Sequence, residues 1–130
     1  MNLTRFSPYA AVVLRLAVGG VFLHHGWWKL HNFAAVTGMV DGIGFPFATV
    51  FAAILTGVET LGAVCVILGV LTRVWALLME VEMVVAILTV LLQHGQAPEV
   101  EGLLLAGSLA LLTLGDGPLS IGQALKQRSD

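Results

Sequence analysis

The stretch that decides the fold is FATVFAAILTGVETLGAVCVILGVL at residues 47–71, followed directly by TRVWALLMEVEMVVAILTVLLQ at residues 72–93. Each run can cross a membrane, because a helix needs roughly 20 apolar residues to span about 30 Å of hydrocarbon. Glu59 stands near the centre of the first run, and Glu80 and Glu82 stand near the centre of the second. A charge at that depth costs roughly 2.5–3.5 kcal/mol on insertion scales, so these carboxyls are expected to face a bundle interior and a partner.

The composition of the whole chain is that of an integral membrane protein. Of the 130 residues, 58% are hydrophobic and 11% are charged, and the mean hydropathy is +0.94. Soluble domains carry about 25% charged residues. The net charge of −2 gives no indication of nucleic acid as a partner. The single cysteine, Cys65, excludes an intrachain disulfide and a cysteine-based zinc site within one chain.

Four segments predict an all-α, four-helix bundle that crosses the membrane and forms a single domain over residues 1–130. The expected spans are about residues 9–30, 48–70, 73–92 and 100–115. The glycines and the proline between residues 31 and 47 indicate an irregular or re-entrant loop. Most basic residues fall on the side of the termini, so the positive-inside rule predicts that both termini are cytoplasmic.

Helical phase indicates which polar side chains can meet. In the first span one inward stripe is expected, and it consists of Arg15, Gly19, Phe22, Gly26 and Lys29. His25 lies beside this stripe, whereas His24 points away from it. Arg15 is also close enough to its helix end to extend its charge to the membrane surface.

The other spans each carry a predicted packing face. Glu59 shares its face with small residues that permit close helix contact, among them Gly62 and Gly69. In the last span Gly102, Ala106 and Ala110 form a second predicted stripe of this kind.

Glu80 and Glu82 are about 200° apart around the third helix, so one face cannot hold both. Glu82 is expected to face inward at the depth of Glu59, and Glu80 to meet a neighbouring subunit or to stay protonated.

Three patterns in order resemble the DoxX family of small four-helix bacterial membrane proteins. They are R-x3-G-x2-F-x2-H-G-x2-K at residues 15–29, GFP at residues 44–46 and E-x2-G-x6-G-x3-R at residues 59–73. The segment EGLLLAGSLALLTLGDGPLSI at residues 101–121 extends the resemblance over nearly the whole chain. The resemblance implies a multi-pass protein of the bacterial inner membrane. It further implies membrane-associated thiol, sulfur or quinone redox chemistry, because DoxX-like proteins include membrane subunits of thiosulfate:quinone oxidoreductases. Glu80 and Glu82 depart from the family pattern, which is mostly apolar there.

The first functional hypothesis is a redox-associated membrane subunit that admits a quinone-like ligand between its helices. Glu59 and His25 are the candidate proton-transfer groups, with Lys29 or Arg15 as the charge complement. The predicted ligand-binding set is Arg15, Phe22, His25, Lys29, Glu59 and Glu82. Whether such a subunit is itself catalytic is left open.

Two further hypotheses remain. In one, the chain is a structural adaptor in the bilayer that forms homo-oligomers or anchors a soluble redox enzyme, and its polar residues fix the helix register. In the other, Glu59, Glu82 and His25 serve a small transporter or a metal site, although no metal ligand is assigned. Polar residues near the outer membrane surface, such as His94 and Glu99, are interpreted as a solvated rim of the bundle.

Overall fold

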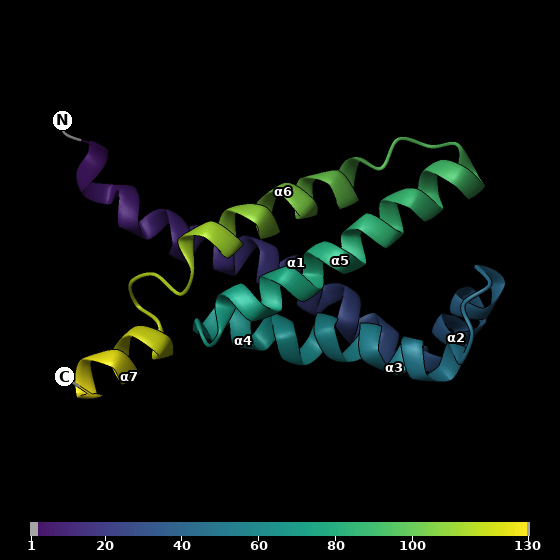
Figure 1. The fold of residues 1–130 in the computed structure, drawn as a ribbon, viewed down its shortest axis with the longest axis horizontal. Helices are drawn as coiled ribbons and strands as arrows, with labels where there is room; N and C mark the ends of the chain where they lie inside the picture. The colour runs from purple at the N-terminus through teal and green to yellow at the C-terminus, as the bar shows by residue number, and fades with distance from the viewer. Residues whose placement is uncertain (1–2, 130) are drawn as a thin grey trace.

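The computed structural model describes residues 3–129, and every regular element in that range is a helix. The prediction of an all-α fold is therefore confirmed. In chain order the elements are η1 (Leu3–Tyr9), α1 (Ala10–His31), α2 (Phe33–Gly42), α3 (Ala48–Gly57), η2 (Val58–Gly62), α4 (Ala63–Leu68), α5 (Thr72–Thr89), η3 (Val90–His94), α6 (Glu99–Leu114) and α7 (Ile121–Ser129). η2 and η3 are π-helical turns. The long helices form a bundle, and η1 and α7 lie at the same end of it (Figure 1).

Within residues 3–129, three helical runs are long and apolar enough to cross a membrane. They are Thr4–His31, Ala48–Leu68 and Thr72–His94. The expected fourth span corresponds to α6, which has 16 residues. At 1.5 Å per residue this helix is about 24 Å long, less than the roughly 30 Å of hydrocarbon. A fourth crossing therefore stays a prediction.

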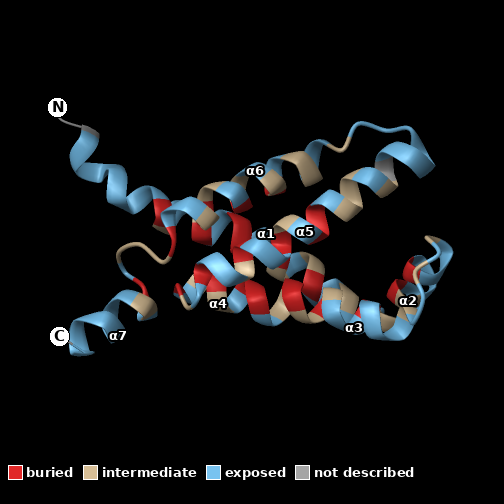
Figure 2. Ribbon diagram, viewed as in Figure 1, coloured by how far each residue is buried: buried red, intermediate tan, exposed pale blue. Residues whose placement is uncertain are grey.

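The core lies where α1, η2, α4, α5 and α6 pack together, as the buried residues in Figure 2 show. Phe22, Met79 and Leu111 are fully buried at its centre. Large apolar side chains cover the outside of the same helices, for example Leu16 and Leu77. An outer surface of this kind suits contact with lipid rather than water.

The segment between the first two long helices is not the irregular loop that was predicted, and whether it re-enters the membrane stays a prediction. Residues Phe33–Gly42 form the helix α2, which packs Val36 and Val40 against Ala52 of α3. Positions 33, 36, 37 and 40 follow helical spacing. Phe33, Val36 and Val40 are apolar, and Thr37 is the one polar residue of the four. The glycines obscured this pattern, because glycine lowers helix propensity without forbidding a helix.

The predicted inward stripe of α1 is present. Arg15, Gly19, Phe22 and Gly26 are buried, and the side chain of Lys29 is 18% exposed. On the facing run, Glu59, Gly62, Val66 and Gly69 are buried as expected. A Cβ atom at Gly62 would lie 2.6 Å from the ring of Trp75, so this glycine does permit a close contact.

The small-residue stripe predicted for the last span is not its buried face. Leu104, Ser108 and Leu111 are buried in α6, whereas Ala106 is exposed. The close contact is made one residue further along, because a Cβ atom at Gly107 would lie 2.6 Å from Val18. Small residues on a helix surface show where a backbone can approach, but not which neighbour approaches.

The loop after α6 is tied to the bundle at the end where η1 and α7 lie. Arg15, which is 1% exposed, donates to the carbonyl oxygens of Pro118 at 3.2 Å and Leu119 at 3.0 Å. Arg15 does not reach the surface, so its charge is used inside the protein. The Gly122 N–H also donates to the carbonyl oxygen of Gly69 at 2.9 Å.

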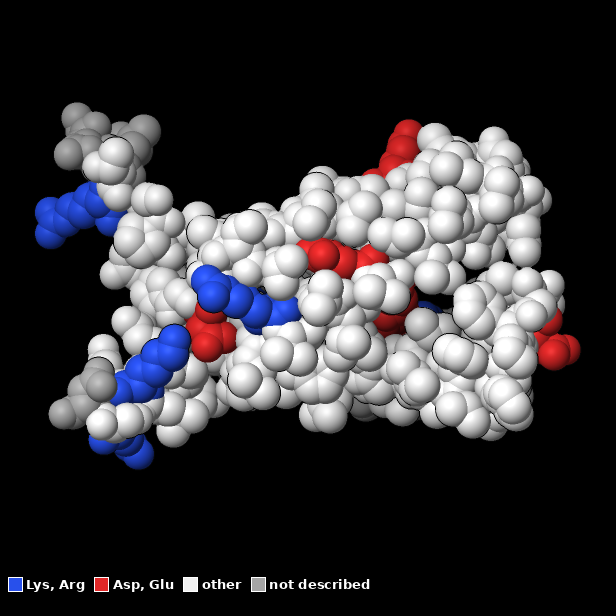
Figure 3. Space-filling view, viewed as in Figure 1, with Lys and Arg blue, Asp and Glu red and all other residues white. Residues whose placement is uncertain are grey.

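Most of the basic side chains visible in Figure 3 lie toward the end where η1 and α7 lie. We therefore expect a cytoplasmic reporter fused after Asp130 to be active and a periplasmic reporter at the same place to be silent. A reporter in the turn at Gly95 should give the opposite result if α6 crosses the membrane. An active periplasmic reporter after Asp130 would contradict the predicted orientation.

Candidate functional site

A buried ionic cluster joins three of the predicted site residues. The Nζ atom of Lys29 lies 2.8 Å from Oε2 of Glu59 and 3.3 Å from Oε1 of Glu82. The two carboxylate side chains are 2% and 7% exposed. With two carboxyls and one ammonium, the cluster is neutral only when it carries one carboxyl proton. Because an isolated charge is costly in hydrocarbon, these three groups are expected to stay in contact inside the bundle.

The backbone around Glu59 is adapted to this cluster. Glu59 lies in η2, a single π-helical turn inside the otherwise α-helical run of α3 and α4. The Thr60 hydroxyl donates to the Thr56 carbonyl oxygen at 2.6 Å, which is the acceptor that the Thr60 N–H would use in a regular α-helix. Such π-turns occur frequently at functional sites.

Gly26 allows α1 to approach this turn directly. A Cβ atom on Gly26 would lie 2.6 Å from the carbonyl carbon of Glu59 and 2.7 Å from its oxygen. Any side chain at this position would therefore push α1 away from η2. Lys29 stands one turn further along the same face of α1, so the close contact also sets how Lys29 reaches Glu59.

The two glutamates of α5 have different environments, as helical phase predicts. Glu82 is buried beside Glu59 and Lys29, on the inward face where its phase along the helix places it. Glu80 is half-buried and outside the cluster, and its Oε1 atom has no hydrogen-bond partner among the described residues.

Glu82 also forms part of the wall of an apolar pocket of about 250 Å³. The other lining residues are all apolar, and they are Val40, Ile43, Phe45, Phe51, Ile54, Leu55, Val58, Leu78, Val81 and Val85. Ile54, Leu78 and Val81 are exposed, so they face lipid and the pocket is reached from the bilayer. The volume is just under the roughly 300–1,000 Å³ of pockets for drug-sized ligands, which suits a single ring-sized group.

The carboxyl of Glu82 belongs to both the ionic cluster and the pocket wall. Its Oε1 atom lies near Lys29, whereas its Oε2 atom is buried and has no hydrogen-bond partner within residues 3–129. A buried polar atom without a partner costs about 1–3 kcal/mol.

Three predicted site residues lie outside the cluster. Phe22 is fully buried in the hydrophobic core. Arg15 binds the carbonyls of the loop after α6, and it lies 14 residues before Lys29, about 21 Å along the helix. His25 is half-buried and makes no hydrogen bond or ion pair with Glu59 or Glu82 in the described part of the chain. The charge complement of the carboxyls is thus Lys29 rather than Arg15.

The pocket walls supplied by α2 and the turn that follows it were not among the predicted site residues. Val40, Ile43 and Phe45 belong to the segment that was expected to be a loop. Its helical spacing, together with the GFP motif, was the signal that could have identified them.

The proposed metal sites are not formed among the described residues. No group of three or more His, Cys, Asp or Glu side chains there is close enough to hold a metal ion. This applies to Glu59, Glu82 and His25, and the Nζ atom of Lys29 lies 2.8 and 3.3 Å from the two carboxylates.

Comparison with known proteins identifies the family. Residues 10–92 match the DoxX family, and they contain helices α1 to α5 and the three residues of the ionic cluster. The chain belongs to the DoxX family. This DoxX protein is 36% identical to an uncharacterized membrane protein of Mycobacterium tuberculosis over 95% of its own length and 85% of that relative. It is 35% identical to an uncharacterized protein of Haemophilus influenzae over 65% of its length and 61% of the relative. No solved structure gives a significant match.

Proposed function

We propose that this DoxX protein is a redox-associated subunit of the bacterial inner membrane that binds a quinone-like ligand and supplies it with a proton. The single observation that supports this function is the double position of Glu82, which belongs both to the buried ionic cluster and to the wall of an apolar pocket. A quinone has an apolar ring and two carbonyl oxygens, so it suits an apolar pocket with one carboxyl-bearing residue in its wall.

The reaction can be written with its electrons and protons. Reduction of a quinone to a quinol consumes two electrons and two protons. Glu82 would give one proton to the nearer quinone oxygen, and Lys29 and Glu59 would hold the remaining charge and restore that proton from water. The other quinone oxygen would take the second proton directly from water at the membrane surface. Lys29 is the partly exposed member of the cluster and connects it to the surface. The electrons would come from a soluble redox enzyme docked on the membrane.

Substitution of Glu82 by leucine tests this function. In detergent-solubilised protein, we expect Glu82→Leu to weaken the binding of decylubiquinone by at least about tenfold, because a hydrogen bond to a charged group contributes about 1.5–3 kcal/mol. Binding would be measured by isothermal titration and by ligand-induced thermal shift. The variant should fold, since Glu59 remains to pair with Lys29.

Glu80→Leu is the matched control, because Glu80 is two residues away on the same helix and outside the pocket. It should leave the affinity within about twofold of the wild type. Equal loss in both variants, or tighter binding to Glu82→Leu, would show that Glu82 does not hold the ligand. Failure of the wild-type protein to bind would favour the adaptor function.

Glu80 supports the adaptor function as a second candidate. Its carboxyl lies among exposed apolar residues of α5, including Leu77, Val81 and Val84, and lacks a partner for Oε1 in the described chain. A second copy of the chain, or a helix of a redox-enzyme partner, would cover this carboxyl. Glu80→Leu should then change the oligomeric state in detergent without affecting ligand affinity.

A further inference from the structure

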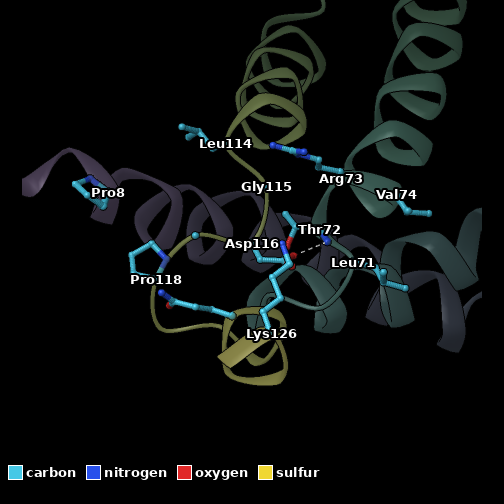
Figure 4. Close-up of a pocket in the computed structure, with 12 residues that line it drawn as sticks. Pro8, Leu71, Thr72, Arg73, Val74, Leu114, Gly115, Asp116, Pro118 and Lys126 are labelled. Carbon is cyan, nitrogen blue, oxygen red and sulfur yellow. Dashed lines mark hydrogen bonds between the residues drawn. The ribbon is translucent and has the colours of Figure 1, made fainter. Parts of the chain in front are cut away.

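A second pocket lies at the end of the bundle where η1 and α7 lie. It has a volume of about 590 Å³, and its walls come from the turn before α5, the start of α5, the end of α6, the following loop and α7. Figure 4 shows Arg73 beside the end of α6, where it donates to the Thr113 carbonyl oxygen at 3.1 Å, and Lys126 extending from α7 toward the loop at Asp116. The apolar pocket at Glu82 shares none of these lining residues.

The charges around this pocket leave a surplus of cations. Asp116 is the one carboxylate among the lining residues, and its Oδ1 atom accepts the Thr72 N–H at 2.9 Å. The buried guanidinium of Arg15 interacts electrostatically with the same carboxylate. Arg73 and Lys126 are exposed, and within residues 3–129 neither forms an ion pair. With Asp116 balanced by Arg15, two positive charges remain for a ligand.

Two of the lining residues also carry hydrogen-bond donors without an acceptor in the described chain. The Thr72 side chain is 0% exposed, and its hydroxyl has no partner among the described residues although Thr72 lines the pocket. Arg73 is the second residue of α5, an 18-residue helix that begins at Thr72, and its backbone N–H has no acceptor in the described chain. The N-terminal end of a helix carries partial positive charge and favours anions, phosphate above all.

The surroundings indicate how such an anion would arrive. The pocket lies where the span Ala48–Leu68 ends and the span Thr72–His94 begins, at the edge of the hydrocarbon. Leu71, Val74 and Leu114 line it and are 45–63% exposed. We propose that this pocket binds a phosphate group, held by Arg73, Lys126 and the Thr72 hydroxyl, with the apolar residues available to the acyl chains of a phospholipid. Inorganic phosphate offers the same chemistry without the chains.

The experiment uses the full chain in dodecyl maltoside, which contains no phosphate. Three ligands are titrated separately: dihexanoyl phosphatidylglycerol, inorganic phosphate, and dihexanoylglycerol, which has the same chains and no phosphate. Binding is followed by native mass spectrometry and by the shift in melting temperature. The variants are Arg73→Gln with Lys126→Gln, and the exposed Lys126→Gln alone in case Arg73 is needed for folding. The matched control is Arg5→Gln with Arg128→Gln, which removes two cations from exposed residues outside the pocket.

We expect at least one phosphate-bearing ligand to bind, dihexanoylglycerol not to bind, and the Arg73 and Lys126 double variant to lose at least tenfold in affinity. The control should stay within about twofold of the wild type. Binding of phosphatidylglycerol alone identifies a lipid headgroup as the source, and equal binding of inorganic phosphate identifies the free ion. Equal losses in the control and the double variant would show a general charge effect and overturn the proposal, as would binding of dihexanoylglycerol as tight as that of the lipid.

Discussion

Replacing Lys29 by methionine is expected to lower the free energy of unfolding by about 3–5 kcal/mol, the usual cost of removing one partner from a buried ion pair. Lys29 is the cation in contact with both Glu59 and Glu82, and each of these side chains is less than 10% exposed. Without it, the two carboxyls would face each other in a low-dielectric interior. The measurement is equilibrium unfolding in mixed micelles with increasing sodium dodecyl sulfate, followed by tryptophan fluorescence.

Two companion variants separate the ion cluster from other effects of the substitution. Lys126→Met removes an exposed lysine that forms no ion pair in the described chain, so it should change the stability by less than about 0.5 kcal/mol. Lys29→Met combined with Glu59→Gln and Glu82→Gln should recover most of the loss, because the amides are neutral. If the triple variant is as unstable as Lys29→Met, packing of the lysine chain rather than charge explains the loss.

The sequence could predict the helices and half of the site because both follow from simple periodicity. Long apolar runs can only be helices in a bilayer, and the spacing of Arg15 to Lys29 identifies one buried face of α1. The same helical periodicity places Glu80 and Glu82 about 200° apart around α5, on nearly opposite faces. Helical phase puts the two glutamates on different faces, and the depth of Glu82 in its span then pairs it with Glu59.

The choice of cation could not be made in the same way. Arg15 and Lys29 lie on one stripe, and periodicity gives the face of a residue but not its depth relative to another helix. The depth depends on how α1 crosses η2, which is set by the contact at Gly26. Arg15 instead binds carbonyl groups of a loop more than one hundred residues away in sequence, where local pattern carries no information.

The π-turn at Glu59 has no recognisable sequence signal either. Thr56 and Thr60 are ordinary helix residues on an apolar run, and their hydroxyls back-bond to Ala52 and Thr56. Whether such hydrogen bonds distort a helix depends on how the neighbouring helices pack against it. Here the close approach of α1 at Gly26 and the turn in the opposite helix occur at the same place, so the two features form a single structural unit that positions Glu59.

Two glycine substitutions in α1 should therefore have opposite effects. Gly26→Ala is expected to destabilise the protein by about 1–3 kcal/mol, the usual cost of overpacking, because its methyl group would lie 2.6 Å from the backbone of Glu59. Gly20→Ala should be neutral or stabilise the protein by up to about 1 kcal/mol, because nothing lies within 4 Å of its Cβ position and alanine is the better helix former. Both are measured by unfolding in mixed micelles.

The same pair tests whether this contact positions the site. Displacement of α1 from η2 by Gly26→Ala would move Lys29 relative to Glu59, so decylubiquinone affinity should fall together with stability. Gly20→Ala should leave the affinity unchanged, since Gly20 is exposed and lies on a different face of α1 from Lys29. A destabilised Gly26→Ala protein with wild-type affinity would show that the contact supports the fold alone. A Gly26→Ala protein as stable as the wild type would show that α1 and η2 can separate without cost, and that the position of Glu59 does not depend on Gly26.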